Sequence, residues 1–316
     1  MEVKHYEFLL TLASKTTDDS DNDGMHALYV ELNRLNGMYW IVCGASLLGR
    51  MHGIDVSRII EGARLKLSTP LPNIRVAEIG GALRALSLVQ LCILCDIPIP
   101  LSMGSEASQF LKLNFDGDRP VFWWFDMRSL YCSLVILKLT KSLIFLDAET
   151  RSRILKYISE SQAVLGGFGA GPRSEAHGGY TFCAVASLQI LNAEIPRLNR
   201  LLRWLEVRLS QYNGRPGKPA DSCYVWWASA CLVMIGNEEN LFKERDRILK
   251  FINFNCVCPH SGGFSKYPSV PLDGSFAHGK QDPDLLHTFL SIASNALFQR
   301  GIIDPVSVLP VGDKVS

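Results

Sequence analysis

The sequence has almost no excess of charge of either sign, because 32 lysine and arginine residues are balanced by 31 aspartate and glutamate residues over 316 positions. We therefore do not expect the long-range positive field of a nucleic-acid-binding protein. Uninterrupted apolar runs stay well short of the roughly 20 residues that cross a bilayer, and residues 1–10 show no secretory signal. With 47% hydrophobic and 20% charged residues, the composition is typical of a folded chain.

The nine cysteines do not follow the spacing of a disulfide framework. Their positions are Cys43, Cys92, Cys95, Cys132, Cys183, Cys223, Cys231, Cys256 and Cys258. Most lie within apolar runs, which is typical of reduced thiols that pack as small hydrophobic side chains. Since no secretory signal is recognisable, we expect a cytoplasmic protein without disulfide bonds.

The sequence does contain a repeated kind of segment, about fifteen residues long and rich in alanine, leucine, cysteine and aromatic side chains. The copies span residues 34–49, 81–95, 126–140, 177–191, 221–235 and 284–298. Each is apolar nearly all round, as expected of a helix that is buried on both sides. Repetition at intervals of about 45–60 residues indicates stacked supersecondary units.

Between these segments lie amphipathic stretches with apolar residues three and four positions apart, at residues 56–67, 148–162, 195–211 and 243–254. We expect them to form outer, half-solvated helices. Glycine-rich turns recur at 166–168, 213–215 and 262–264, where glycine would permit a positive φ. Alternating inner and outer helices predict an all-α fold, an α/α barrel (toroid) whose inner helices begin around one central cavity.

We expect residues 1–316 to form this barrel as a single domain. Within it, residues 1–25 are predicted to be an N-terminal helix with an acidic linker, and residues 300–316 a C-terminal tail. Residues 268–281 are predicted to be a surface insertion before the last inner helix. The linker and the insertion do not need a function of their own.

Asp221, Cys223 and His287 form the strongest candidate site. Asp221 and Cys223 open one inner segment, and His287 lies near the start of another. A carboxylate, a thiolate and an imidazole can bind Zn²⁺ and leave a fourth position open, as catalytic zinc requires. These residues alone leave an alternative, in which Asp221 caps a helix while Cys223 and His287 are unrelated core residues.

A second group combines cationic and aromatic side chains. It consists of His177, Arg215, Lys218 and Tyr224, with Arg128 and Tyr131 on another inner segment. Cations beside a helix N-terminus, together with a histidine and a tyrosine hydroxyl, can bind a diphosphate. The alternative is a solvated loop with ordinary surface bases.

A third group is aromatic and lies on the inner segments. Its members are Trp40, Tyr180, Phe182, Trp226 and Trp227. A cavity lined with aromatic rings would suit a long apolar ligand. Ordinary core packing would also explain each of these rings taken singly.

Three long motifs make the chain resemble the β subunits of the protein prenyltransferases. They are GGFGAGPRSEAHGGYTFCAVASL at 166–188, NGRPGKPADSCYVWWASACL at 213–232, and GGFSKYP at 262–268 with DPDLLHTF at 282–289. The resemblance covers nearly the whole chain. It implies an α/α barrel that holds catalytic zinc through Asp221, Cys223 and His287 and that binds a separate α subunit.

The resemblance also implies residues that bind the substrates. By this likeness, an isoprenoid diphosphate would be held by His177, Arg215, Lys218 and Tyr224. Tyr224 would also act in catalysis. Those that would line the isoprenoid tunnel are Trp40, Tyr180 and Trp227, with Gly179 also among the substrate-binding residues, and Arg128 would lie toward the peptide. Zinc would lower the pKa of the acceptor cysteine, whose thiolate would attack the allylic carbon that bears the diphosphate.

Within this family the sequence looks most like the type I geranylgeranyltransferase. That enzyme has a lysine where Lys266 stands, whereas the farnesyl and Rab-type enzymes have an aspartate that helps to bind Mg²⁺, so we expect no Mg²⁺ requirement. At Asn36 the farnesyl enzyme has a tryptophan, and the smaller side chain leaves room for a fourth isoprene unit. The resemblance thus implies geranylgeranyl transfer to small GTPases of the Rho, Rac or Rap type whose CaaX sequence ends in leucine.

Other assignments stay open at this stage. The segments at 36–40 and 222–227 are closer to the Rab-type subunit, and 177–183 matches the farnesyl enzyme. A non-catalytic barrel would keep the fold without the site. A terpene cyclase would need an aspartate-rich motif in the cavity, whereas the aspartate cluster of this sequence is in the N-terminal linker. The family's first glycine-rich turn is not recognisable at 66–80.

Overall fold

The computed structural model describes residues 2–16, 24–51, 54–55, 80–117, 119–269, 282–299 and 302–311. Some expectations concern segments outside these residues. They are the acidic linker at 17–23, the outer helix at 56–67, most of the segment at 66–80, most of the insertion at 268–281, and the end of the tail at 312–316. The regular secondary-structure elements of the described part are helices, apart from one short hairpin.

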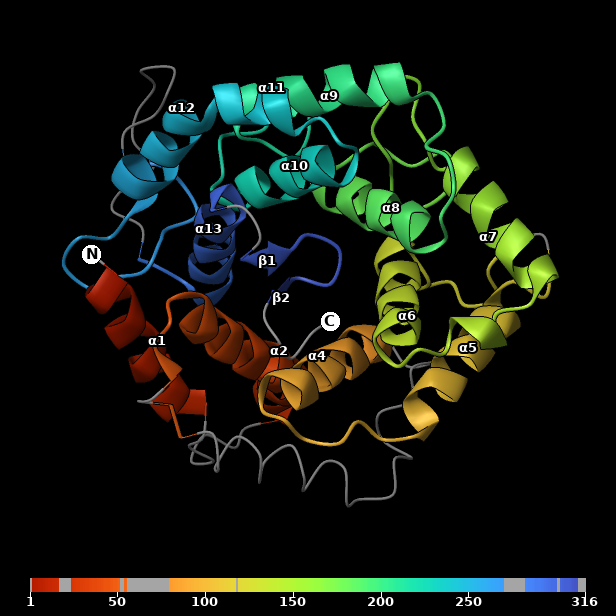
Figure 1. Ribbon diagram of the computed structural model, residues 1–316, viewed down its shortest axis with the longest axis horizontal. Coiled ribbons are helices and arrows are strands. Elements are labelled where there is room, and N and C mark those ends of the chain that lie inside the picture. Colours follow the sequence, from red (N-terminus) through yellow and green to blue (C-terminus); the bar gives the residue numbers. More distant parts are fainter. Residues whose placement is uncertain are drawn as a thin grey trace.

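Six helices form a closed ring (Figure 1). In ring order they are α2 (Gly24–Leu47), α4 (Gly81–Leu94), α6 (Met127–Leu139), α8 (Gly178–Ile190), α10 (Cys223–Met234) and α13 (Leu285–Phe298). Each packs against the next, and α13 packs against α2, which closes the ring. These helices coincide with the six apolar segments of the sequence, so the prediction of inner helices is confirmed.

Amphipathic helices surround this ring (Figure 1). They are α1 (Glu2–Thr16), α5 (Ser102–Asn114), α7 (Ala148–Glu160), α9 (Leu198–Gln211), α11 (Glu238–Lys243) and α12 (Arg245–Lys250), with the 3-10 turn η2 (Leu143–Phe145) before α7 and the π-helical turn η3 (Phe251–Cys256) after α12. In α9, Leu201, Leu205 and Leu209 are buried at four-residue spacing, so the helix packs one stripe on the ring. The two layers form the predicted α/α toroid.

Hydrogen bonds tie the Gly-Gly-Phe turns to the inner helices that follow them. The Phe168 amide donates to Thr181 Oγ1 over 2.9 Å, and the Phe168 carbonyl accepts from the His177 amide over 3.0 Å. The turn at 262–264 repeats both bonds, with Phe264, Thr288 and Asp284 in the corresponding roles. Both phenylalanine side chains are buried, so these turns fix the positions at which α8 and α13 begin.

The predicted turns require glycine on two different physical grounds. Gly166 and Gly262 have φ values of 118° and 73°, which side chains with a Cβ rarely adopt. At Gly214 the prediction of a positive φ is wrong, because this residue is not among the described residues with positive φ. A Cβ on Gly214 would lie 2.2 Å from the ring of Tyr224. Gly214 is therefore needed for close packing rather than for its backbone conformation.

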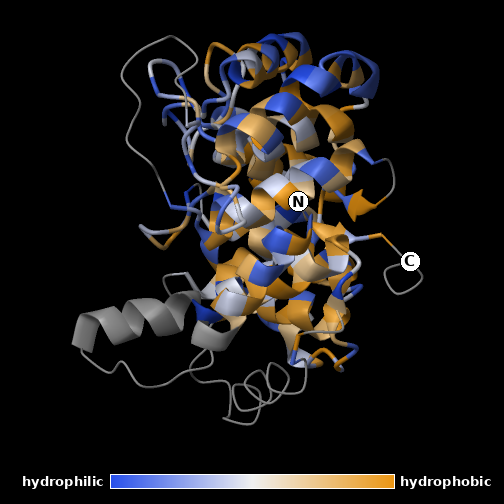
Figure 2. Ribbon diagram, turned by 90° about the vertical axis from the view of Figure 1, so that its left-hand side faces the viewer, coloured by the Kyte–Doolittle hydropathy of each residue, from blue (hydrophilic) through white to orange (hydrophobic). Residues whose placement is uncertain are grey.

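A short hairpin near the C-terminus lies inside the ring (Figure 1). Its strands β1 (Ile303–Asp304) and β2 (Leu309–Pro310) pair antiparallel, with Ile303 opposite Pro310. Side chains of three inner helices donate to three successive carbonyls of the connecting turn. These bonds are Tyr131 Oη to Val306 (2.8 Å), Gln90 Nε2 to Ser307 (2.8 Å) and Tyr39 Oη to Val308 (2.5 Å). Residues 303–310 of the predicted tail therefore fill the inside of the ring, and we call them the plug. Figure 2 shows hydrophilic loops at the opposite end of the barrel from the C-terminus.

The cysteines and the helix lengths agree with the sequence analysis. No disulfide joins any of the nine cysteines, and seven of them are buried, as predicted for thiols that pack in the core. Among the described helices, none combines the length and the apolar character needed to span a membrane.

The plug gives a test of the fold. Replacing Gln90 with methionine removes the donor to the buried Ser307 carbonyl, which we expect to cost roughly 1–3 kcal/mol of folding free energy. For a chain of this length that corresponds to a melting temperature lower by roughly 2–5 °C. The matched control is Gln189→Met on the exposed face of α8, which should leave the melting temperature almost unchanged. Equal effects of the two variants would contradict the assigned role of the Gln90 bond.

Candidate metal centre and anion-binding pocket

Asp221, Cys223 and His287 converge at the N-terminal ends of α10 and α13. Each offers a ligand atom, and these atoms all lie within 4.8 Å of one another. The three residues are only 5%, 7% and 8% exposed. Donors that bind one zinc ion at about 2.0–2.3 Å can be at most about 4.6 Å apart, so small side-chain shifts suffice to bring all three to a common ion. The predicted grouping of these residues is confirmed.

Hydrogen bonds hold the three candidate ligands in place. The Cys223 amide donates to Asp221 Oδ1 over 2.9 Å, and His287 Nε2 lies 3.2 Å from the same oxygen. On its other side, His287 Nδ1 lies 2.6 Å from Asp284 Oδ2. A carboxylate on the second ring nitrogen is the usual way to orient a metal-binding histidine. Asp284 therefore leaves Nε2 to face Asp221 and Cys223.

The pKa values in this cluster respond to burial and to the two carboxylates. Burial raises the pKa of the Cys223 thiol well above its usual value, and the neighbouring Asp221 raises it further. Burial alone would lower the pKa of His287, but its hydrogen bonds to Asp221 and Asp284 outweigh burial and raise it to about 9. The cluster therefore favours a positive charge among its three donors. The set of one oxygen, one sulfur and one nitrogen donor fits Zn²⁺.

The turn at 262–267 brings a lysine to this cluster. The Ser222 amide donates to the Lys266 carbonyl over 2.9 Å, and the Ser222 hydroxyl donates to the Ser265 carbonyl over 2.8 Å. These bonds attach the start of α10 to the turn, and Lys266 Nζ lies 3.9 Å from Asp221 Oδ2. Burial alone would lower the pKa of Lys266, but Asp221, Tyr267 and Cys223 together outweigh burial and raise it. The ammonium group is thus held beside the candidate metal ligands.

His177 and Tyr224 form a pair next to the cluster. His177 caps α8, and its Nδ1 accepts a hydrogen bond from the Gly179 amide over 3.2 Å. Burial and the nearby Arg215 lower the pKa of His177 and so favour the neutral ring. Because Nδ1 accepts the Gly179 hydrogen bond, the proton of the neutral ring is on Nε2. Nε2 lies 2.8 Å from Tyr224 Oη and therefore donates to it. The hydroxyl proton of Tyr224 then remains available to a ligand.

Arg215 and Lys218 lie on the loop before α10. Arg215 Nη1 is 2.6 Å from Glu175 Oε2, and both side chains are substantially exposed. Lys218 is exposed, as expected of a loop base. Together with His177 and Tyr224 these cations border the N-terminal ends of α8 and α10, where helix dipoles also favour an anion.

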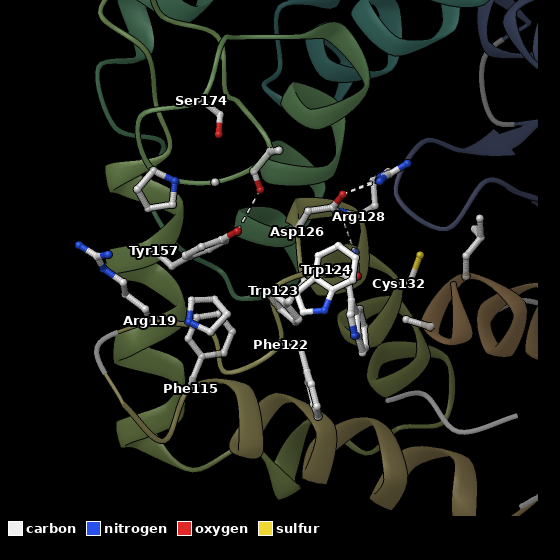
Figure 3. Close-up of a pocket in the computed structure, with 18 of the residues that line it drawn as sticks. Phe115, Arg119, Phe122, Trp123, Trp124, Asp126, Arg128, Cys132, Tyr157 and Ser174 are labelled. Carbon is white, nitrogen blue, oxygen red and sulfur yellow. Dashed lines mark hydrogen bonds and ion pairs between the residues drawn. The ribbon is translucent and has the colours of Figure 1, made fainter. Parts of the chain in front are cut away.

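The predicted aromatic group separates into two parts. Phe182 and Trp226 are almost completely buried, as the alternative of ordinary core packing predicts for single rings, and they are core residues between inner helices. Trp40, Tyr180 and Trp227 are half-buried. Arg128 lies over the ring of Tyr180 at 5.5 Å and pairs with Asp126, which caps α6. The ion pair at the start of α6 is visible in Figure 3.

Three acidic partners were not predicted from the sequence. They are Asp284 on His287, Glu175 on Arg215 and Asp126 on Arg128. Asp284 and Asp126 carried a recognisable signal, because an aspartate directly before a helix is a common N-cap. Glu175 carried no signal, since it reaches Arg215 across 40 positions of sequence.

Comparisons with known proteins agree with the fold. A family model described as the prenyltransferase alpha-alpha toroid domain matches residues 3–66 and 101–309. The geranylgeranyl transferase type-1 subunit beta of Arabidopsis thaliana is 29% identical over 221 residues, 65% of this chain and 52% of that protein. The protein farnesyltransferase subunit beta of Schizosaccharomyces pombe is 32% identical over 172 residues, 50% of this chain and 42% of that protein. The chain therefore spans about half the length of these relatives.

A solved structure has the same architecture. It is the Candida albicans protein geranylgeranyltransferase-I complexed with GGPP, which superimposes with a TM-score of 0.74. The superposition covers 98% of this chain and 96% of the other, at 18% sequence identity. At this identity the likeness concerns the fold.

The cluster predicts a specific pattern of metal binding. We expect Cys223→Ala to abolish stoichiometric binding of a divalent ion, because the loss of one of three ligands destroys such a site. The control is Cys231→Ala, a buried cysteine two turns further along α10, which should retain the metal. The metal content of both purified variants, measured by atomic emission, shows whether Cys223 is a ligand. Full metal content in the Cys223 variant would contradict the assignment of these ligands.

Proposed function

This chain belongs to the prenyltransferase alpha-alpha toroid family, and from that premise we propose that it is the catalytic β subunit of a zinc-dependent protein geranylgeranyltransferase of type I. The observation on which the proposal rests is the buried cluster of Asp221, Cys223 and His287 beside the His177–Tyr224 pair. An α subunit would complete the enzyme. The acceptors would be small GTPases whose C-terminal CaaX sequence ends in leucine.

The proposed reaction joins an acceptor cysteine to a geranylgeranyl group. A carbon–sulfur bond forms between the cysteine and the allylic carbon, the carbon–oxygen bond to the diphosphate breaks, and the thiol proton is lost to solvent. The products are a thioether and diphosphate. Asp221, Cys223 and His287 would hold Zn²⁺, which when bound lowers the pKa of the acceptor thiol.

The residues beside the cluster would act on the leaving group. Since the His177 proton is donated to Tyr224 Oη, the Tyr224 hydroxyl can donate to a diphosphate oxygen as negative charge develops there. Arg215 would exchange the exposed Glu175 carboxylate for the diphosphate, which presents more charge to a guanidinium. Lys218 and the N-terminal end of α8 would add to this stabilisation.

Lys266 supports the type I assignment. Its ammonium group lies next to the candidate metal ligands and would supply, beside the diphosphate, the positive charge that a Mg²⁺ ion supplies in other members of the family. We therefore propose that the reaction needs no Mg²⁺. An aspartate at this position would instead require an added cation to balance its charge.

Asn36 supports the choice of a long isoprenoid. Asn36 is 3% exposed, lies in the wall of a cavity of about 1590 Å³, and accepts a hydrogen bond from the Ser87 hydroxyl over 2.9 Å. A tryptophan at this position would fill space that a longer chain can occupy. A farnesyltransferase is the second candidate, favoured by the 32% identity to the Schizosaccharomyces pombe subunit.

A donor competition tests the proposal. The chain co-expressed with an α subunit should use geranylgeranyl diphosphate in preference to farnesyl diphosphate by at least about tenfold in kcat/KM, as expected when added methylenes bind in a fitted pocket. Asn36→Trp should shift the preference toward farnesyl. Ser87→Ala, which removes the partner of Asn36 without adding volume, should keep the preference of the wild type. A wild-type preference for farnesyl would exclude the type I assignment.

The role of Lys266 gives a second test. Wild-type turnover should be nearly the same with and without millimolar Mg²⁺, whereas Lys266→Asp should lower turnover severalfold in a way that Mg²⁺ restores. Lys243→Asp on exposed α11 is the control and should behave as the wild type. Steady-state rates in buffers with and without Mg²⁺ provide the measurement. A wild-type requirement for Mg²⁺ would contradict the proposed function of the ammonium group.

A further inference from the structure

An acidic side chain lies among the cations that are proposed to bind the diphosphate. Glu175 Oε2 is 2.6 Å from Arg215 Nη1. A carboxylate oxygen and a phosphate oxygen bind a guanidinium in the same way, so Glu175 takes up hydrogen-bonding capacity of Arg215 that a diphosphate would use. A carboxylate in this place weakens the attraction of the pocket for an anion, which calls for a functional explanation.

The backbone brings Glu175 to Arg215. The two residues are 40 positions apart and lie on the loops that lead into α8 and α10, which are neighbours in the ring (Figure 1). The Gly178 amide donates to the Gly214 carbonyl over 2.9 Å and joins the start of α8 to the loop before α10. At Gly169 a Cβ would lie 2.9 Å from the Glu175 carbonyl oxygen, so the loop before α8 is closely packed. The ion pair therefore follows from the positions of two anchored loops.

The two charges act in opposite directions on a neighbouring residue of the pocket. Burial and Arg215 lower the pKa of His177, whereas Glu175 raises it. His177 is hydrogen-bonded to Tyr224, whose hydroxyl would contact the diphosphate. Glu175 thus cancels part of the positive potential that Arg215 creates at the groups proposed to bind the leaving group.

The ion pair is weak enough for a diphosphate to displace it. The side chains of Arg215 and Glu175 are 40% and 60% exposed, and a pair this exposed shifts an equilibrium by about fivefold at most, because water screens both charges. A diphosphate has several charged oxygens and can bind a guanidinium through two of them. Glu175 therefore lowers the affinity of the pocket for the diphosphate without blocking it.

The charge balance of the proposed reaction shows why a lower affinity is useful. When the carbon–oxygen bond of the donor breaks, both bonding electrons remain on the diphosphate, which gains one negative charge. Cations that stabilise this charge as it develops also bind the released diphosphate more tightly than the donor. Slow product release limits turnover in many enzymes. A carboxylate that pairs with the guanidinium as the product leaves opposes this retention.

We propose that Glu175 is an internal competitor for the diphosphate, which pairs with Arg215 in the free enzyme, gives way to the donor, and pairs with Arg215 again as the product diphosphate leaves. Glu175 is therefore a positioning residue that acts through Arg215 and needs no contact with the substrate. The exchange involves no covalent step and no proton transfer. This inference rests on the proposed function, because it takes the ligand of the pocket to be the diphosphate of an isoprenoid donor.

The test is a calorimetric titration of inorganic pyrophosphate into the complex with the α subunit, and the sign of the effect decides it. Glu175→Gln keeps the shape of the side chain and removes its charge, so we expect it to tighten pyrophosphate binding by about two- to fivefold. If Glu175 served only to hold Arg215 in position for binding, the same variant would bind pyrophosphate more weakly. Weaker or unchanged binding would overturn the proposal.

Two further variants separate competition at Arg215 from a general effect of charge. Glu149→Gln removes the carboxylate that pairs with Arg153 on α7, so it changes the net charge equally and should leave the Kd of pyrophosphate unchanged. In an Arg215→Ala background, Glu175→Gln should give no further gain in affinity, because the competition acts through the guanidinium. A gain of the same size without Arg215 would mean a long-range charge effect and would contradict the proposal.

Turnover measurements distinguish a failure of this inference from a failure of the proposed function. With a CaaX peptide as acceptor, Glu175→Gln should lower the KM of geranylgeranyl diphosphate and strengthen inhibition by added pyrophosphate, while its kcat does not rise. Lipid transfer by the wild type, with equal pyrophosphate affinities of the wild type and Glu175→Gln, would refute the inference and leave the proposed function. Tighter pyrophosphate binding by the variant in a complex that transfers no lipid would refute the proposed function and support the competition at Arg215.

Discussion

This site depends on hydrogen bonds from neighbouring turns, which fix the positions at which the inner helices begin. The Phe168 and Phe264 turns each make the same two bonds to the helix that follows, and Ser222 joins the start of α10 to the turn that carries Lys266. Because α8, α10 and α13 start at fixed positions, the side chains just before and within their first turns lie close together. Asp126, His177 and Asp284 are helix caps as well as site residues.

Much of this arrangement could be predicted from the sequence. The ring follows from apolar segments that are buried on nearly every side, and the metal cluster follows from motifs that keep Asp221 and Cys223 at the start of one helix and His287 at the start of the next. Contacts between distant segments could not be predicted this way. Glu175 reaches Arg215 from another turn, and Gly214 is required by the ring of Tyr224, which is packed against it.

The aromatic residues show a second limit of sequence analysis. Phe182, Trp226 and Trp227 are similar in composition and position on the inner helices, yet the first two are core and the third is half-buried near Cys223. An inner helix contacts both neighbours and the layer outside, so its periodicity does not mark the side that faces the cavity. The hairpin plug is a related case, since the short stretch at 302–311 resembles an ordinary tail until its carbonyls are matched with Tyr39, Gln90 and Tyr131.

The plug and the closing helix also bear on how the chain is made. The ring closes where α13 packs on α2, and α1 adds to that seam through Lys4, which donates to the Pro259 carbonyl, and His5, which accepts from the Gly263 amide. Segments that are far apart in the sequence, and are therefore synthesised at different times, are partners at this seam. Until synthesis reaches residue 311 and the nascent chain clears the exit tunnel, α2 and α4 have apolar faces without their final neighbours. The ring can therefore close only after its late segments have been made, and its early helices stay incompletely packed until then.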